Sequence, residues 1–359
     1  MSRLLLSLFF PLVLLIVFYS VPAGLLAPQS RPALFPPGTP LSISPSWCDP
    51  YGITILLMGE DPELRFDRNL QDASRLGARW VQLSFPTYLR NHDSIELPVR
   101  DRRTPDLSTV QRSIMRAKSS GFKVALHPIL LIQDPEDPHW RGQLDPPEKE
   151  LWYDNYQQWI VQLSRLAQRC HVDLFFVGSE LSSMQNDRAE WLKILKSVRL
   201  EFSGPVTYSA NWDNWAQVSF AEQLDGLGVN GYVPFPGHQT QSGEQLIQHL
   251  LPFRSRLLRW SEQMGLPIFF SEVGYPSHSR ALDTPWNQYQ GQQIDVESQK
   301  RGYEAFIATF SGDQQIRGVF FYALHRDGGL RDAGYTPIGK PAEEIIRKYL
   351  GTISRVDRK

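Results

Sequence analysis

The chain alternates short apolar runs with longer amphipathic segments, and this alternation restricts its fold more than any other feature. Several runs lack the in–out alternation of a half-exposed strand, as expected of parallel strands buried on both faces. Eight runs are predicted to be strands: 52–58, 80–85, 123–130, 174–177, 206–209, 224–229, 268–271 and 318–322. The segments predicted to be helices are 69–76, 107–120, 156–166, 191–198, 244–264, 296–310 and 341–350.

Strand–helix alternation repeated eight times is typical of a (β/α)8 barrel, which has about 250 residues or more. We therefore predict an α/β fold with a single (β/α)8 TIM barrel. An open, doubly wound sheet is the alternative. No shift in composition marks a second domain, and no short repeat indicates a solenoid. The barrel domain is expected over residues 51–350, with a short tail at 351–359.

The N-terminal segment has the features of a targeting sequence. Arg3 precedes a stretch without charged residues from Leu4 to Ser30. Residues 1–27 are predicted to be either a signal peptide, cut after Ala23, or a retained signal anchor. The seven prolines of residues 28–50 then predict an extended, Pro-rich linker. Under either alternative the barrel lies outside the cytoplasm, secreted or anchored to the membrane by residues 4–27.

Charge and cysteine content exclude several classes of protein. The 37 Lys and Arg nearly cancel the 38 Asp and Glu, so there is no electrostatic reason to expect nucleic acid as a partner. Two cysteines cannot build a disulfide scaffold or a four-cysteine zinc site. Cys48 and Cys170 either pair in an oxidising compartment or stay as two buried thiols.

Motifs for metals and cofactors are also missing. There is no H-E-x-x-H, no spaced Cys/His pair and no acidic calcium loop, so we predict no metal and no cofactor. No G-x-S-x-G marks a serine hydrolase. Residues 226–231 match G-x-G-x-x-G, but Tyr-Val-Pro-Phe-Pro follows. Such a sequence cannot open the helix that a dinucleotide site requires.

Two predicted strands end in a glutamate, Glu180 after strand four and Glu272 after strand seven. A single glutamate there is usually a capping or surface residue, but in a barrel catalytic residues gather at the carboxyl ends of the strands. In a retaining glycosidase one carboxyl protonates the leaving oxygen, and the other attacks the anomeric carbon about 5–5.5 Å away. The acid needs apolar surroundings, and the nucleophile needs hydrogen-bond donors such as Tyr232.

The segments around these glutamates resemble glycoside hydrolase family 113, a family of β-mannanases in the large clan of retaining barrel glycosidases called clan A. The resemblance runs from about Trp47 to Leu350. It implies that Glu180 is the acid/base and Glu272 the nucleophile, and that a β-1,4-linked mannose polymer is cleaved with retention and without a cofactor. The matching segments are 140–142, 176–181, 206–213, 224–232, 270–275, 285–286 and 335–342.

Two positions depart from clan A. Ser179 stands where much of the clan has an asparagine that contacts the sugar 2-hydroxyl. Strand eight often ends in a tryptophan beneath the reacting sugar, whereas this chain offers Tyr322 or His325. Because the 2-hydroxyl is axial in mannose and equatorial in glucose, the choice of polysaccharide stays open.

Aromatic residues make up 12% of the chain, and sugar rings stack on aromatic faces. We expect part of them to gather at the rim around the two glutamates. His127 fits a buried, satisfied histidine as well as a site residue, and Asn211 and Trp212 fit a turn with a packed indole. The predicted substrate-binding residues are Ser179, His127, Trp140, Asn211, Trp212, Tyr232, Tyr275, Trp286 and Tyr322.

The sequence thus predicts a monomeric, retaining glycoside hydrolase with endo-β-1,4-mannanase activity, acting on a polysaccharide or oligosaccharide. One alternative is a non-catalytic glycan-binding or envelope-associated protein that kept the barrel. The other is a glycosidase of altered specificity.

Overall fold

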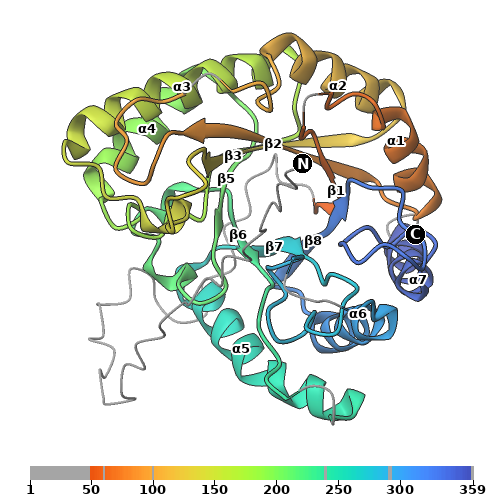
Figure 1. Cartoon of the computed structure of the whole chain (residues 1–359). Coiled ribbons are helices and arrows are strands. Elements are labelled where there is room, and N and C mark those ends of the chain that lie inside the picture. Colours follow the sequence, from red (N-terminus) through yellow and green to blue (C-terminus); the bar gives the residue numbers. More distant parts are fainter. Residues whose placement is uncertain (1–48, 60, 99–100, 238–240, 290–292, 357–359) are drawn as a thin grey trace, which may run out of the picture. The chain divides into compact units, whose positions relative to one another are not determined.

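Eight parallel strands form a closed barrel in chain order, with β1 hydrogen-bonded to β8 (Figure 1). The computed structural model describes residues 49–59, 61–98, 101–237, 241–289 and 293–356. The prediction of a barrel is confirmed, and the alternative of an open sheet is wrong. The strands are β1 (Tyr51–Leu56), β2 (Trp80–Leu89), β3 (Lys123–Ile132), β4 (Leu174–Ser179), β5 (Val206–Ala210), β6 (Gly226–Asn230), β7 (Ile268–Val273) and β8 (Ile316–Leu324).

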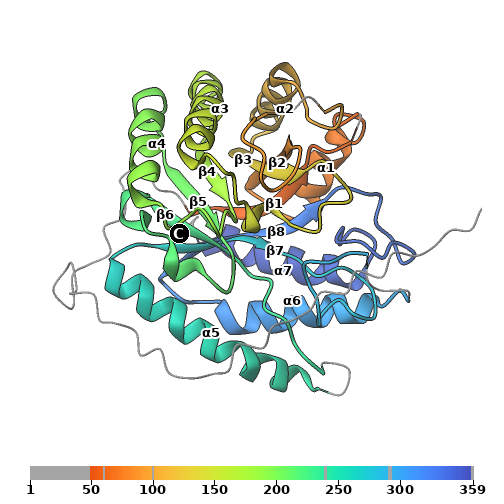
Figure 2. The same ribbon diagram turned by 60° about the vertical axis from the view of Figure 1, so that its left-hand side comes forward.

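The helices lie outside the strands, with α2, α3 and α4 side by side (Figure 2). All seven predicted helices are present, and the last continues six residues beyond Leu350, into the predicted tail. They are α1 (Phe66–Arg75), α2 (Leu107–Ser119), α3 (Lys149–Arg169), α4 (Arg188–Glu201), α5 (Gly243–Met264), α6 (Val296–Phe310) and α7 (Pro341–Val356). Between β5 and β6 there are only the 3-10 turns η2 (Trp215–Gln217) and η3 (Ala221–Gln223), so the eightfold alternation is incomplete.

Burial explains the continuous apolar runs of the sequence. Strands β2, β4, β5, β6 and β7 are buried along their whole length, because one face meets the barrel interior and the other meets the helices. A separate apolar cluster joins side chains from several strands, including Trp80, Phe176, Phe269 and Phe320. Phe269 meets Phe176 and Phe320 edge to face, with ring centroids 5.9 and 6.3 Å apart. This cluster is an apolar layer of the barrel.

Several predictions about the N-terminal region lie outside the described residues. They are the signal or anchor segment, most of the linker and any pairing of Cys48, and all of them stay predictions. Cys170 is buried. Within the described ranges, no helix is both long enough and apolar enough to span a bilayer.

Close packing behind β4 fixes the backbone that leads to Glu180. Gly178 lies against Tyr156, Trp191 and Tyr208, and a Cβ added there would be 2.9 Å from the Tyr156 hydroxyl and 3.1 Å from the Trp191 ring. These aromatic side chains are fully buried, so they cannot move aside into solvent. Only glycine fits between β4 and this aromatic wall.

Gly178→Ala should therefore destabilise the protein, by about 1–3 kcal/mol, because overpacking a dense core forces the backbone or its neighbours to shift. Urea unfolding of the purified variant measures the change. Gly243→Ala is the matched control, since a Cβ at this position in α5 meets nothing within 4 Å. Equal stability of the two variants would contradict this account of β4.

Candidate active site

Glu180 and Glu272 lie at the carboxyl ends of β4 and β7, the end of a (β/α)8 barrel at which catalytic residues are found. Glu180 directly follows β4, and Glu272 is the second-last residue of β7. Their exposures are only 7% and 5%. Glu180 also has a left-handed backbone with φ of 54°, which is costly for a residue with a Cβ and is often found at functional sites. Two buried carboxyls on separate strands thus share one rim.

Asn230, the last residue of β6, connects the two carboxyl-bearing strands. Its backbone pairs with Glu272 in the β6–β7 register, while its side-chain Nδ2 donates to Glu180 Oε1 over 2.6 Å. Its Oδ1 accepts from the hydroxyls of Ser209 and Ser271 at 3.0 and 2.9 Å. The Glu180 carboxylate that pairs with Arg141 only accepts hydrogen bonds, so the amide presents Nδ2 to it and turns Oδ1 toward the two hydroxyls.

Arg141 supplies a cation to the same carboxyl. Its guanidinium forms an ion pair with Glu180 Oε2, and its side chain is only 16% exposed. The neighbouring Trp140 ring lies against the backbone, because a Cβ on Gly142 would be only 2.3 Å from that ring. The Trp140-Arg141-Gly142 segment therefore needs a glycine so that the indole can fold back over the turn that carries the arginine.

Tyr232 is the hydrogen-bond donor to Glu272, with its hydroxyl 2.8 Å from Oε2. His127 is completely buried, and its Nδ1 lies 3.8 Å from Glu272 Oε1, too far for a hydrogen bond. The His127 ring packs on Phe176 of the apolar layer, with centroids 4.3 Å apart. Burial, helped by the nearby Arg141, lowers the pKa of His127 to about 3. The imidazole is therefore neutral and brings no charge to Glu272.

Burial and the neighbouring Glu180 carboxylate raise the pKa of Glu272 to about 8, although Arg141 and the Tyr232 hydrogen bond oppose the shift. A carboxylate pair of this kind resists holding two negative charges. The raised pKa favours a protonated Glu272 beside the ion pair of Arg141 with Glu180. A carboxyl with an exchangeable proton next to a second carboxyl can serve general acid–base catalysis.

Three of the predicted tryptophans lie in loops that follow barrel strands, Trp140 after β3, Trp212 after β5 and Trp286 after β7. Trp212 follows β5 and Trp286 follows β7, and their rings stack at 6.5 Å with an angle of 16°. Trp286 and Trp140 are 47% and 37% exposed. Tyr322 of β8 meets the Tyr232 ring edge to face at 6.2 Å. Tyr322 thus packs against the tyrosine that donates to Glu272, and a role of the tryptophans in sugar binding stays a prediction.

The other predicted residues have varied positions. Tyr275 is fully buried against Tyr303 and α6, where a Cβ on Gly302 would lie 2.6 Å from its ring, and its role in substrate binding stays a prediction. Ser179 is buried, and its hydroxyl has no hydrogen-bond partner among the described residues. Asn211 is partly exposed and accepts a hydrogen bond from the backbone N–H of Trp212.

Arg141 and Asn230 were missed as site residues by the sequence analysis, although both fall in segments quoted for the family resemblance. Asn230 could have been found from its place, because it is a polar residue that ends an otherwise apolar strand. The position of Arg141 in the sequence does not mark it as a site residue, because it does not end a strand. It lies in a loop after β3, and only the folded chain brings it to Glu180.

A closed (β/α)8 barrel with two buried carboxyls at the ends of β4 and β7 has the architecture of a barrel glycoside hydrolase. The sequence matches the family model of Glycoside Hydrolase Family 113 over residues 63–334. The chain therefore belongs to glycoside hydrolase family 113. No curated protein matches it in sequence.

Solved structures share the fold at low sequence identity. The family 113 β-mannanase AaManA from Alicyclobacillus acidocaldarius, in complex with ManMIm, has a TM-score of 0.77 at 22% identity, covering 86% of this chain and 98% of its own. A further family 113 β-1,4-mannanase has a TM-score of 0.74 at 21% identity, covering 85% and 100%. A β-glucuronidase from Faecalibacterium prausnitzii has a TM-score of 0.58 at 14% identity, covering 85% and 49%.

Glu272→Gln should stabilise the protein, and the gain should grow with pH. Because the pKa of Glu272 rises from 4.5 to about 8 on folding, the wild type takes up a proton when it folds between these pH values, and its stability falls as pH rises. The neutral amide has no such dependence. We expect the difference in unfolding free energy to approach about 5 kcal/mol above the raised pKa.

Chemical denaturation of both proteins across this pH range measures the difference. Glu262→Gln, which changes an exposed carboxylate on α5, serves as the control and should show no such trend. A difference that is constant with pH, or that shrinks as pH rises, would contradict the burial argument.

Proposed function

We propose that this family 113 chain is a retaining glycoside hydrolase that cleaves β-1,4-linked mannan by double displacement, with Glu180 as acid/base and Glu272 as nucleophile. The single observation that carries the proposal is the pair of buried carboxyls on β4 and β7, joined through Asn230. The substrate is supported by the β-mannanases of the same family whose fold this chain shares.

The proposed reaction has two steps. Glu272 attacks the anomeric carbon while Glu180 protonates the departing glycosidic oxygen, which leaves a glycosyl ester on Glu272. Glu180, now ionised, then takes a proton from water, and the resulting hydroxyl displaces Glu272 from the sugar. Both steps invert the anomeric carbon, so the product keeps the original configuration and both carboxyls return to their starting states.

Burial and the neighbouring Glu180 carboxylate favour the proton on Glu272, whereas this reaction requires it on Glu180. The ion pair with Arg141 exists only while Glu180 is ionised, whereas the raised pKa keeps the proton on Glu272. Glycan binding must therefore weaken the Arg141–Glu180 contact and move the proton to Glu180. The positive charge that develops at the anomeric carbon favours an ionised Glu272. The Tyr232 hydroxyl stabilises this carboxylate by donating a hydrogen bond to it.

The aromatic rim suits an uncharged polymer. Trp140 and Trp286 are partly exposed, and Trp286 stacks with Trp212. Flat aromatic faces bind the C–H faces of sugar rings without requiring charge on the ligand. We assign these rings to sugar binding on either side of the glutamates.

Hydrolysis of a polysaccharide panel tests the function directly. We expect release of reducing ends from β-mannan, with the β-anomer appearing first when the products are followed by NMR. Glu180→Gln should lower kcat by about 10²–10⁴-fold, the usual contribution of a general acid, and Glu272→Gln should abolish hydrolysis. Glu262→Gln again serves as the control. The assignment is wrong if Glu272→Gln hydrolyses every substrate at the wild-type rate.

The pH profile tests the proton arrangement. Above about pH 8 both carboxyls are ionised and no proton remains for the leaving oxygen, so kcat/KM should fall as pH rises through this value. Tyr232→Phe removes a hydrogen bond that lowers the pKa of Glu272, and should move this decline to higher pH. A rate that stays level through the alkaline range would contradict a shared proton.

A further inference from the structure

Arg141 is a largely buried cation with unused hydrogen-bond donors. Its side chain is only 16% exposed, and its guanidinium pairs with Glu180 Oε2. A guanidinium has five N–H donors, but among the described residues Glu180 is the only hydrogen-bond partner of Arg141, and the buried Nε has none. Buried donors without acceptors are costly. The guanidinium therefore suits a ligand that is rich in acceptor oxygens.

The two oxygens of Glu180 are held in different ways. Oε1 accepts from Nδ2 of Asn230 over 2.6 Å, and Asn230 is itself held by the hydroxyls of Ser209 and Ser271. Oε2 is held by Arg141, a long side chain in the 3-10 turn η1 (Arg141–Gln143) after β3. An amide nitrogen can only donate, so its contact with Oε1 suits an unprotonated oxygen. Oε2 is thus the oxygen that can carry a proton once the guanidinium moves aside.

We propose that Arg141 is a specificity-determining residue on the leaving-group side of the site, where it releases Glu180 and donates hydrogen bonds to hydroxyls of the departing sugar. The inference rests on the proposed function, in which Glu180 protonates the glycosidic oxygen. That oxygen must come within hydrogen-bonding distance of Oε2, about 2.5–3.0 Å. The guanidinium occupies this place in the structure, so the leaving sugar takes its position and becomes its neighbour.

The backbone of the turn η1 is anchored beside Glu180. The carbonyl of Gly142 accepts from the backbone N–H of Ser183 at 3.1 Å, and the Ser183 hydroxyl donates to the carbonyl of Leu144 at 2.7 Å. The turn is thus fastened to the segment that follows Glu180. A guanidinium that leaves Oε2 moves only over the length of its own side chain, and it therefore stays next to the leaving sugar.

Trp140 supplies the apolar part of the same subsite. It directly precedes Arg141 in the chain, it is partly exposed, and its ring centroid lies 5.9 Å from the guanidinium carbon. The C–H faces of sugar rings stack on aromatic faces, and sugar hydroxyls accept hydrogen bonds from guanidinium N–H groups. The adjacent indole and guanidinium therefore fit the two kinds of surface that one pyranose ring presents.

The charges of the centre favour an uncharged leaving sugar. Once the proton has moved to Glu180, the negative charge lies on Glu272, and Arg141 is one of the groups that lower the pKa of Glu272. Arg141 therefore remains the compensating cation for a carboxylate after it releases Glu180. A ligand with its own carboxylate would add a second negative charge to this balance, whereas the hydroxyls of a neutral sugar leave it unchanged.

Two substrates with the same mannobiosyl part test the role of Arg141. Mannotriose releases a sugar, whereas trifluoroethyl β-mannobioside releases a simple alcohol that also needs a proton but has no sugar hydroxyls. Arg141→Lys keeps the charge and loses the planar fork of donors. It should lower the kcat/KM for mannotriose, relative to that for trifluoroethanol release, by about tenfold or more, the usual loss of a hydrogen bond to a charged group.

Arg259→Lys makes the same change at an exposed position of α5 and is the matched control, with the wild-type ratio. A wild-type ratio in Arg141→Lys would overturn the proposal, because a purely structural role lowers both rates alike. That result would leave the proposed function intact. A wild type that hydrolyses neither substrate would instead contradict the proposed function, and the role of Arg141 with it.

A crystal structure of Glu272→Gln with a manno-oligosaccharide bound across the cleavage point tests the contact without hydrolysis and without a change at Arg141. We expect a guanidinium nitrogen within about 3.2 Å of a hydroxyl oxygen of the leaving-side sugar, and the contact with Glu180 Oε2 broken. A guanidinium that still holds Oε2 beside the bound oligosaccharide, or that has no sugar oxygen in reach, would overturn the proposal. Failure of the variant to bind any manno-oligosaccharide would overturn it as well.

Discussion

Two carboxyl groups held out of water beside one arginine are the constraint that the rest of the rim must satisfy. Ionised carboxylates at such a position repel each other and lose hydration. Arg141 supplies one positive charge to Glu180, and the raised pKa of Glu272 favours its protonated form. Together they limit the negative charge at the centre. This balance leaves one exchangeable proton beside a second carboxyl, which suits the proposed acid–base role.

Precise placement of these groups depends on the barrel beneath them. Asn230 is held by hydroxyls from β5 and β7 at its Oδ1 and by the Glu180 carboxylate at its Nδ2. Below, His127 rests on Phe176 of the apolar layer and closes the floor of the site. The hydrogen bonds of Asn230 above this apolar layer leave few alternative arrangements, and this rigidity can hold the strained backbone of Glu180 in place.

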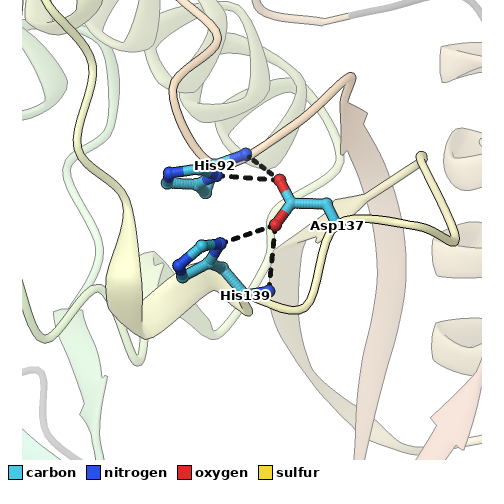
Figure 3. Close-up of side chains that lie close together, drawn as sticks. All are labelled: His92, Asp137 and His139. Carbon is cyan, nitrogen blue, oxygen red and sulfur yellow. Dashed lines mark hydrogen bonds and ion pairs between the residues drawn. The ribbon is translucent and has the colours of Figure 1, made fainter. Parts of the chain in front are cut away.

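The loops after β2 and β3 add a second level of organisation. The carboxylate of Asp137 contacts the Nδ1 atoms of His92, in the loop after β2, and of His139, in the loop after β3 (Figure 3). Trp140 and Arg141 directly follow His139 in the chain. Gly142 allows the indole to fold onto this turn. The position of the arginine at Glu180 therefore depends on a loop that is organised by its own polar cluster.

The sequence by itself determined the barrel and the family. Periodicity and apolar runs are local properties, so all eight strands and seven helices could be found from neighbouring residues, and the strand-end rule then singled out Glu180 and Glu272. Only the tertiary structure decided what surrounds them. Arg141, Asn230 and the His92–Asp137–His139 cluster act through contacts between distant segments, and no spacing rule encodes such contacts. Tyr275 shows the converse: a strand-end aromatic looks the same in sequence whether it faces the rim or packs beneath α6, because the direction of a side chain is set by the packing around it.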